Sequence, residues 1–283
     1  MQIHSFVAKT EDSLNFEAVH FTSPTLLVGL SGAGKSQLLS YLFETFQIMC
    51  GKESPSLPSG TYTLDFEFEG DEYQFLTTVH AGEVRLKKLL SDSENPVISL
   101  LNVTELKQYL IQIKNIVAFR QAAGDFCQHI NDEQKREEIR QLYHFIFDEM
   151  DDIEFSSMRF RESEGEWIDV NEMSDGMIKT FSYLAELIMA PEGSVFLIDE
   201  FENGLGLNCL NVLLEEMLER EDIQLIMSSH HPYIINNIPS QCWQVITREK
   251  NNIFATSAEQ LGIGLTRYDA FFELMNRFYQ GGE

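Results

Sequence analysis

The sequence predicts an α/β fold in which a mixed sheet forms the core, accompanied by an antiparallel β subdomain and a helical subdomain. Three patterns predict it. A glycine-rich loop stands between a strand-like and a helix-like segment, alternating residues mark a hairpin near 62–79, and helix-like and strand-like segments alternate from residue 174 onward. The last pattern is typical of a parallel sheet. With 283 residues, 43% of them hydrophobic, the chain is long enough to bury such a core.

The first third of the chain is expected to be rich in strands. A short apolar run leads into the glycine-rich loop, and a helix follows the loop. After a segment rich in Pro, Gly and Ser at 52–60, a turn at Gly70-Asp71 joins the two arms of the hairpin. The expected segments are strands at 3–8, 14–21 and 25–28, a helix at 37–43, and hairpin arms at 62–68 and 73–79.

The remaining elements are expected to be mixed. Residues from about 104 to 150 are mostly helical in their pattern, with Asn131 and Gln134 placed as a capping box. Ser174 is placed as the N-cap of an apolar helix. We expect one domain with lobes at 1–100, 101–173 and 174–283. The other expected segments are a hairpin with arms at 153–161 and 166–170, strands at 194–198 and 223–227, and a terminal helix that contains 271–275.

Composition limits the partners and the compartment. The formal net charge is -25, which disfavours charge-driven binding to DNA or to an anionic membrane and favours protein partners. No apolar run approaches the ~20 residues of a membrane span, and the N-terminus has no signal-peptide pattern. We therefore expect a cytoplasmic protein with reduced thiols and no zinc or disulfide framework. Its cysteines are widely spaced, at Cys50, Cys127, Cys209 and Cys242.

The glycine-rich loop satisfies G-x-x-x-x-G-K-[ST] between a predicted strand and a predicted helix. Backbone N–H groups and the helix dipole converge at such a position, which favours a polyphosphate. Lys35 is expected to contact the β- and γ-phosphates, and Ser36 a Mg²⁺ ion. A glycine turn that matches the motif by chance is the simpler explanation. A chance match, however, would not need a strand before it and a helix after it. The candidate nucleotide-binding residues are Gly29, Ser31, Gly32, Ala33, Gly34, Lys35, Ser36 and Gln37.

Two acids end the apolar run at 195–198. Asp199 and Glu200 would lie at the carboxyl edge of the sheet, where ligands bind in open α/β sheets. Asp199 is expected to hold Mg²⁺, and Glu200 to polarise the attacking water. A polar strand end before a helix is common, so the functional interpretation depends on the phosphate loop.

Two further groups are candidates for contact with the γ-phosphate. His230 follows the strand at 223–227 and is expected to hydrogen-bond that phosphate, although the adjacent His231 leaves the assignment open. Ser174, Asp175 and Gly176 open a helix whose free N–H groups suit an anion. Local chemistry alone does not separate this interpretation from an ordinary capped helix.

The order of these motifs resembles the ATP-binding cassette (ABC) ATPases, most closely their non-transporter branch of SMC, RecF and OLD-like ATPases. In that resemblance the loop at 29–36 is the Walker A motif, 174–176 the signature motif, 199–200 the Walker B motif, and His230 the switch histidine. The run at 199–205 is similar to the D-E-P-E-N-G-L run of the OLD-like group. The resemblance covers essentially the whole chain.

The resemblance implies ATP and Mg²⁺ as cofactors and an ATP-sandwich homodimer or higher oligomer, in which the signature helix of one protomer faces the Walker motifs of the other. Gln121 is the candidate for the Q-loop and a metal contact. Two departures are visible. Gly206-Leu207 stands where the OLD-like group has His-Pro, and the signature lacks the L-S-G-G-Q form of transporters.

The expected function is an ATPase sensor that holds or releases a separately encoded effector protein, as small OLD-like ATPases do in bacterial defence against phage. We expect no room for a Toprim nuclease domain or a long SMC-type arm in these 283 residues. The alternative is a RecF- or SMC-like DNA-repair clamp, against which the net charge weighs. A transporter ATPase subunit is disfavoured by the signature.

Overall fold

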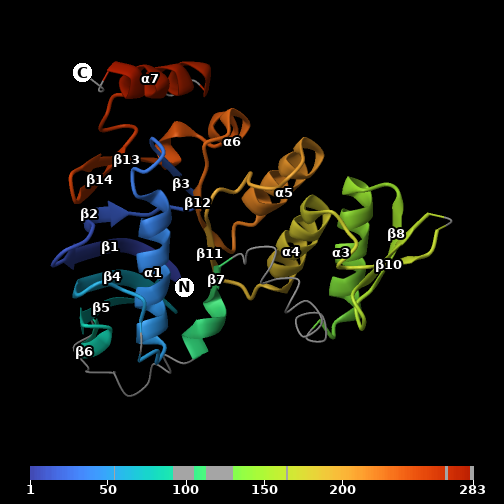
Figure 1. The fold of residues 1–283 in the computed structure, drawn as a ribbon, viewed down its shortest axis with the longest axis horizontal. Helices are drawn as coiled ribbons and strands as arrows, with labels where there is room; N and C mark the ends of the chain where they lie inside the picture. The colour runs from blue at the N-terminus through green and yellow to red at the C-terminus, as the bar shows by residue number, and fades with distance from the viewer. Residues whose placement is uncertain (54, 92–104, 113–129, 164, 265–266, 281–283) are drawn as a thin grey trace. The chain divides into compact units, whose positions relative to one another are not determined.

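The computed structural model describes residues 1–53, 55–91, 105–112, 130–163, 165–264 and 267–280, which fall into two compact units (Figure 1). The first unit comprises Met1–Gln112, Glu192–Phe201 and Asp222–Glu283, and the second comprises Ile113–Pro191 and Glu202–Glu221. Each unit is assembled from separate stretches of the sequence. The chain therefore returns to the first unit twice before its last helix.

An eleven-stranded mixed sheet forms the first unit, as the sequence predicts. The strand order is β6-β5-β4-β1-β2-β14-β13-β3-β12-β11-β7. The run from β13 to β7 is parallel, whereas β1, β2, β4, β5 and β6 pair antiparallel with one another. The strands are β1 (Gln2–Thr10), β2 (Asn15–His20), β3 (Thr25–Val28), β4 (Gly60–Phe68), β5 (Asp71–His80), β6 (Glu83–Ser91), β7 (Leu110–Gln112), β11 (Val195–Ile198), β12 (Gln224–Ser228), β13 (Trp243–Glu249) and β14 (Asn252–Ser257).

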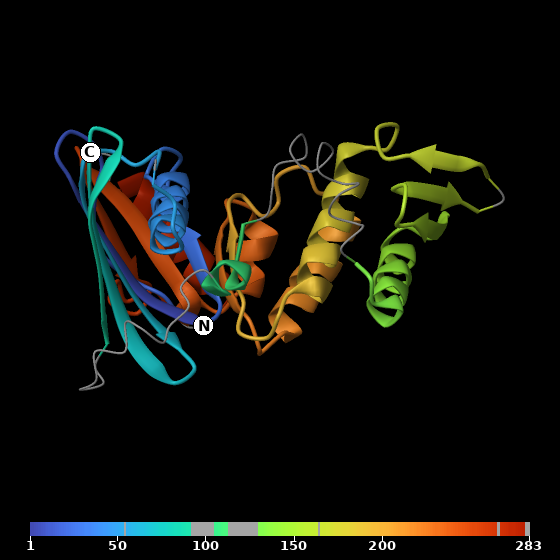
Figure 2. The same ribbon diagram turned by 90° about the horizontal axis from the view of Figure 1, so that it is seen from below.

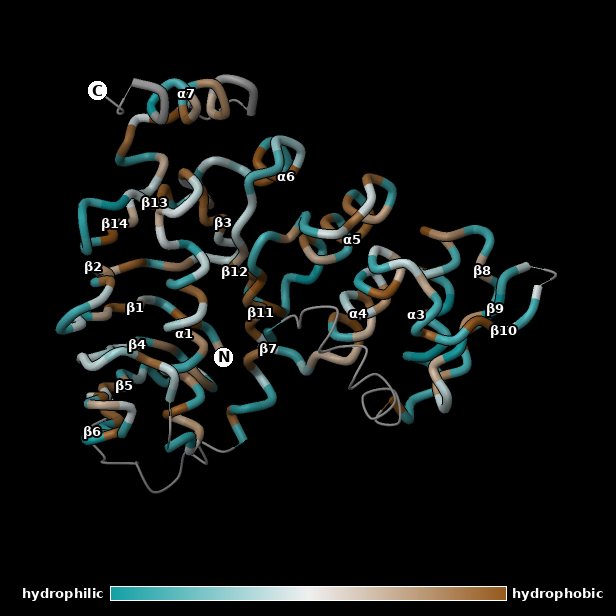
Figure 3. Tube along the Cα trace, viewed as in Figure 1, coloured by the Kyte–Doolittle hydropathy of each residue, from teal (hydrophilic) through white to brown (hydrophobic). Residues whose placement is uncertain are grey.

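Helix α1 (Lys35–Met49) covers one face of this sheet (Figure 2). Leu38, Leu42 and Phe46 recur every four residues and are fully buried, so one stripe of the helix packs on the sheet. Every residue of β3, β11 and β12 is buried, as expected for central parallel strands, and the hydrophobic residues of β11 stand out in Figure 3. Shorter helical elements of this unit are η2 (Glu105–Tyr109), α6 (Pro232–Asn237), η3 (Ser240–Cys242) and α7 (Arg267–Gln280).

The second unit packs three helices with a small antiparallel sheet of order β10-β9-β8. The rings of Tyr143, Phe160 and Phe181 meet in its core, with centroids 5.3–6.1 Å apart. Burial raises the pKa of Tyr143, whose hydroxyl donates to the carbonyl oxygen of Met177. The elements are α3 (Glu133–Ile146), β8 (Met150–Glu154), β9 (Arg159–Glu162), β10 (Trp167–Asp169), α4 (Asp175–Met189) and α5 (Leu207–Glu219).

Most predicted elements are confirmed, and four details are corrected. Asp132, not Asn131, caps α3: its side chain accepts from the N–H groups of Gln134 and Lys135. Within the stretch predicted to be helical, β7 is a strand, because it pairs with β11. The hairpin arm predicted at 153–161 is itself two strands, β8 and β9, and β6 was not predicted.

No helix among the described residues is long and apolar enough to span a membrane. Of the cysteines, Cys50, Cys209 and Cys242 are free thiols, and Cys127 lies outside the described residues.

Candidate functional site

The parallel strands of the first unit bring three predicted motifs to one edge of the sheet. β12 lies between β3 and β11, and the register pairs Leu27 with Ser228 and Ile198 with Met227. All three strands run in the same direction, so their carboxyl ends meet at that edge. The glycine-rich loop, Asp199-Glu200 and Ser228-Ser229-His230 therefore start from neighbouring strand ends.

The glycines of the loop are required by its backbone. Gly32 and Gly34 have φ values of 80° and 108°, in the left-handed region that side chains disfavour. At Gly29 a Cβ atom would lie 2.4 Å from the carbonyl oxygen of Ile246, so a side chain does not fit between the loop and β13. The loop is thus a close-packed cradle whose shape depends on residues lacking Cβ. That shape fits the polyphosphate expected from the sequence.

Lys35 is folded back into the loop. Its side chain is 5% exposed, and Nζ donates to the carbonyl oxygens of Gly29 (2.9 Å) and Leu30 (3.1 Å). Helix α1 begins at Lys35, and no side chain caps its first turn. Ser36 and Gln37 follow in that turn and are exposed. The helix N-terminus is therefore open to an anion, with one ammonium group held beside it.

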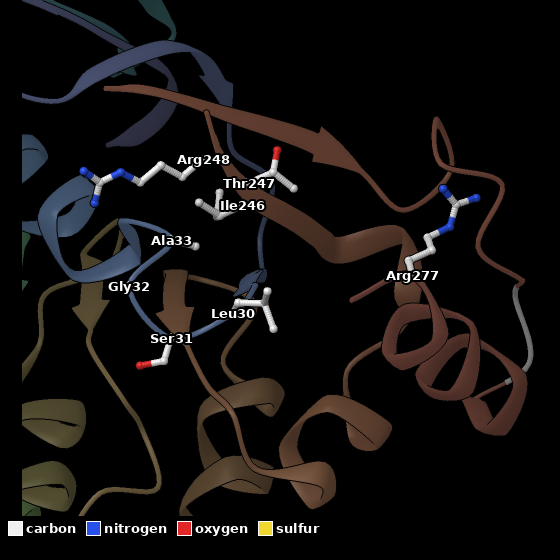
Figure 4. A pocket seen from close by; sticks show the side chains of 8 residues that line it. All are labelled: Leu30, Ser31, Gly32, Ala33, Ile246, Thr247, Arg248 and Arg277. Atoms are coloured by element: carbon white, nitrogen blue, oxygen red, sulfur yellow. The ribbon is translucent and has the colours of Figure 1, made fainter. Parts of the chain in front are cut away.

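Two arginines line a pocket on the outer side of the loop (Figure 4). The pocket has a volume of about 320 Å³, and in this view Arg248 and Arg277 extend to either side of the loop residues. Both guanidinium groups carry positive charge beside the loop, whereas the chain as a whole is acidic. The loop contributes Leu30, Ser31, Gly32 and Ala33, β13 and its end contribute Ile246, Thr247 and Arg248, and α7 contributes Arg277.

Ser228, at the end of β12, holds the turn that carries the two acids. Its hydroxyl donates to Asp199 Oδ1 at 2.6 Å and accepts from the backbone N–H of Glu200 at 2.8 Å. The carbonyl oxygen of Ser228 also accepts from the N–H of Phe201 at 3.1 Å. Glu200 has a φ of 48°, a left-handed conformation that costs about 1 kcal/mol or more for a residue with a side chain. Ser228 therefore contacts the strained turn through both its side chain and its backbone.

The two adjacent histidines have different surroundings. His231 is the N-cap of α6: its Nδ1 accepts from the backbone N–H of Tyr233 at 3.2 Å, and its own N–H donates to Ser229 Oγ at 3.0 Å. His230 is exposed at the same sheet edge as Asp199 and Glu200. His231 thus has a structural task, which favours His230 as the residue that meets a ligand.

The signature segment opens α4 in the second unit. Ser174 caps the helix, and its Oγ accepts from the N–H of Met177 at 3.3 Å. Asp175 is in the first turn, where a carboxylate favours the helix dipole. A Cβ on Gly176 would lie 3.1 Å from the carbonyl oxygen of Gly204, so this glycine permits the turn at 202–206 to approach the helix.

The turn at 202–206 is tied to α4 by a second contact. The ammonium of Lys179 donates to the carbonyl oxygen of Asn203. Leu207 follows the turn as the first residue of α5 and is 74% exposed. Gly206 and the exposed Leu207 thus stand where the resemblance predicts His-Pro, next to a turn that contacts α4.

Sequence reasoning gave no role to Ser228, and it proposed one residue that the structure does not describe. Ser228 was visible as a polar residue ending an apolar strand, but its hydrogen bonds depend on the parallel pairing of β11 with β12, which has no local signal. Gln121, the candidate Q-loop residue, lies outside the described residues.

Comparisons with known proteins agree with this geometry. Residues 106–236 match the model of a family described as "AAA domain, putative AbiEii toxin, Type IV TA system". Among solved structures, an SMC head bound to the C-terminal winged-helix domain of ScpA is 12% identical, with a TM-score of 0.65, and covers 92% of this chain and 100% of that one. The SMC head domain of Thermotoga maritima is 13% identical, with a TM-score of 0.58, and covers 91% of this chain and 99% of that one. The sequence matches no curated protein.

At this level of identity the structural matches establish the fold, and they extend over nearly all of the chain. The family match includes β7, α4, β11 and β12, together with Asp199 and Glu200 after β11 and Ser228 at the end of β12. The chain therefore has the fold of the SMC head domains, and its residues 106–236 match the AAA domain family whose description names a putative AbiEii toxin.

Proposed function

We propose that this chain binds ATP with Mg²⁺ at the loop of residues 29–37 and hydrolyses it. The observation that carries the proposal is the convergence of the loop, Asp199-Glu200 and His230 at one edge of the sheet. The cradle without Cβ atoms, the buried Lys35 and the uncapped start of α1 support it. Each of these features favours a polyphosphate over a neutral ligand.

Different residues of the chain are proposed to contact the phosphates and the Mg²⁺ ion. Backbone N–H groups of the loop and of Ser36 and Gln37 would contact the phosphates. Lys35 Nζ would exchange its two loop carbonyls for the β- and γ-phosphate oxygens. Ser36 Oγ and an Asp199 oxygen are the groups placed to hold Mg²⁺, which supplies charge neutralisation to the phosphates.

Glu200 is the proposed general base. The base must lie within hydrogen-bond reach of the attacking water, so the strained turn that orients Glu200 is part of the machinery. His230 would contact the γ-phosphate and thereby sense its presence. Ser228 is a positioning residue for both acids.

The proposed active form is a homodimer or higher oligomer in which Ser174, Asp175 and Gly176 of one protomer complete the site of another. The Ser174 side chain accepts from the N–H of Met177, and the N–H groups of Asp175 and Gly176 at the start of α4 would contact the anion. The exposed Leu207 beside the turn at 202–206 gives this region apolar surface that a second protomer would cover.

The proposed biological role is that of a cytoplasmic sensor whose ATP cycle holds or releases a separately encoded effector, in defence against phage. The description of the matched family names a putative toxin of a toxin–antitoxin system, and this supports a role linked to a toxic effector. The net charge of -25 supports a partner with a basic face, since opposite potentials steer association.

Nucleotide binding is tested with Lys35→Ala, measured with a fluorescent ATP analogue and by phosphate release. We expect binding or turnover to be lost in this variant. Lys52→Ala is the matched control, because Lys52 is a partly exposed lysine of the same unit that pairs with Glu44 at 2.7 Å. Wild-type affinity and turnover in Lys35→Ala would refute the site.

The effector is tested by co-expressing the chain with its neighbouring genes and purifying it in defined nucleotide states. We expect a second protein to co-purify and its retention to differ between wild type and Glu200→Gln under ATP. Recovery of the chain alone in every state would contradict the sensor role.

The alternative function is a DNA clamp, which the likeness to SMC heads favours. The test is the ATPase rate with and without duplex DNA at about 0.15 M salt. Strong stimulation by DNA, together with no co-purifying protein, would select the clamp. No stimulation would support the sensor.

A further inference from the structure

A histidine and two glutamates converge on the sheet of the first unit, away from the carboxyl edge that carries the phosphate loop. His4 comes from β1, Glu67 from β4 and Glu72 from β5, three strands that lie side by side in the sheet. His4 Nε2 lies 3.8 Å from Glu67 Oε2 and 3.5 Å from Glu72 Oε1. One ligand atom from each side chain lies within 4.8 Å of the other two.

A β-bulge directs His4 into this group. In the ladder between β1 and β4, Ile3 pairs with Phe66 and Ser5 pairs with Asp65, so His4 is the extra residue between them. A bulge re-aims the side chain of its extra residue and disrupts the ladder locally. A regular strand would have no such irregularity. The irregularity in the pairing of β1 with β4 thus lies at His4, the residue that supplies the imidazole.

The two glutamates face one another across the hairpin. Glu67 and Glu72 are direct partners in the register of β4 and β5. Like charges at directly opposed positions destabilise a sheet. His4 Nε2 is buried and has no hydrogen-bond partner among the described residues, although the histidine side chain as a whole is 34% exposed. A cation between the three groups would relieve the repulsion and satisfy the orphaned nitrogen.

We propose that His4, Glu67 and Glu72 bind one divalent transition-metal ion of the zinc class, which links β1, β4 and β5. In a tetrahedron with metal–ligand bonds of about 2.0–2.2 Å, neighbouring ligand atoms lie about 3.3–3.6 Å apart. The two nitrogen–oxygen distances here are close to that range. A water molecule would take the fourth position, since three protein ligands leave it open.

The donor set distinguishes this site from the Mg²⁺ site of the nucleotide. Imidazole suits Zn²⁺ and its neighbours in the transition series, whereas Mg²⁺ prefers six oxygens and loses water reluctantly. A neutral imidazole and two carboxylates would balance a divalent charge. Millimolar Mg²⁺ is therefore expected not to displace the ion.

The direct test is titration of the untagged, chelator-treated full chain with ZnCl₂ at about pH 8 in the presence of Mg²⁺, followed by calorimetry. We expect one site that is at least 10-fold weaker in His4→Ala and in Glu72→Gln. His80→Ala is the matched control, because His80 is an exposed histidine of the same sheet, on β5, whose ring lies 3.9 Å from the carboxylate of Glu11. Zinc binding that is equal in wild type and both site variants would overturn the proposal.

A second measurement uses the opposed glutamates and follows thermal stability. Glu72→Gln removes the cross-strand repulsion, so in chelator its Tm is expected to be equal to or above that of wild type. At a zinc concentration about 100 times Kd, wild type is expected to gain about 5 °C and the variant much less. This reversal of order between chelator and zinc supports the site. An identical zinc-induced shift in both proteins would refute it, and Glu72 is exposed enough that its variant is expected to fold.

Discussion

Replacing Ser228 by alanine removes the hydroxyl that hydrogen-bonds to both Asp199 and Glu200, the acids proposed to hold Mg²⁺ and to act as the general base. The lost hydrogen bonds are one to a carboxylate, worth about 2 kcal/mol, and one from a peptide N–H, worth about 1 kcal/mol. We expect the free energy of unfolding to fall by about 2–3 kcal/mol. Without the serine, the strained backbone of Glu200 is free to relax and to carry its carboxylate away from the water. Because a displacement of about 1 Å costs roughly 10²-fold in rate, kcat is expected to fall by about that factor while ATP binding persists.

The assays are urea unfolding, steady-state phosphate release and binding of a fluorescent ATP analogue. Ser182→Ala is the control, because Ser182 is a buried serine of α4 whose Oγ has no hydrogen-bond partner within the described structure. Its removal is expected to leave stability within about 0.5 kcal/mol of wild type or to raise it. If Ser228→Ala and Ser182→Ala behave alike in both stability and kcat, the positioning role assigned to Ser228 is wrong.

Three further expectations concern the reaction, the oligomer and a buried thiol. Glu200→Gln is expected to bind ATP, to hydrolyse it slowly and to accumulate as a closed dimer in light scattering; unchanged turnover without association would contradict this. Gly176→Leu is expected to bind ATP without hydrolysing it, and mixing it with Lys35→Ala should restore some activity, because a heterodimer has one intact composite site. Activity that never recovers, in a variant that unfolds normally despite the Gly204 contact, would exclude the trans arrangement. Burial raises the pKa of the Cys50 thiol to about 11, so stability is expected to fall as pH rises from about 9 to 11, and Cys50→Ala should flatten this loss in urea unfolding.

The sequence predicted the parts of the site that have local signals. The glycine-rich loop was predictable because its backbone demands fall on Gly29, Gly32 and Gly34 themselves. The strands that end at Asp199 and Ser228 were predictable because continuous apolar runs of this length indicate buried strands. What these residues do together required the strand order, which no local pattern contains.

The errors have physical causes in particular residues. Asn131 and Asp132 are both good N-caps, and only the backbone conformation at the helix start selects Asp132. β6 contains the exposed Leu86 and Leu90 among charged residues, so it lacks the alternation of a half-buried strand and is held mainly by pairing with β5. The His4 group was invisible for the same reason, since its three members meet only through cross-strand register.

The position of β3 has a consequence for the order in which the chain is made. Its two neighbours, β12 and β13, come about 200 residues after it in the sequence, and the carbonyl oxygen of Ile246 packs against Gly29. At about 5–20 residues per second, a ribosome needs roughly 10 to 40 s to synthesise the stretch between them. During that time the phosphate loop lacks β13, against which it packs, and both edges of β3 are unpaired. A nascent chain of this protein is therefore expected not to bind ATP, and to be accessible to chaperones, until β12 and β13 have left the ribosome.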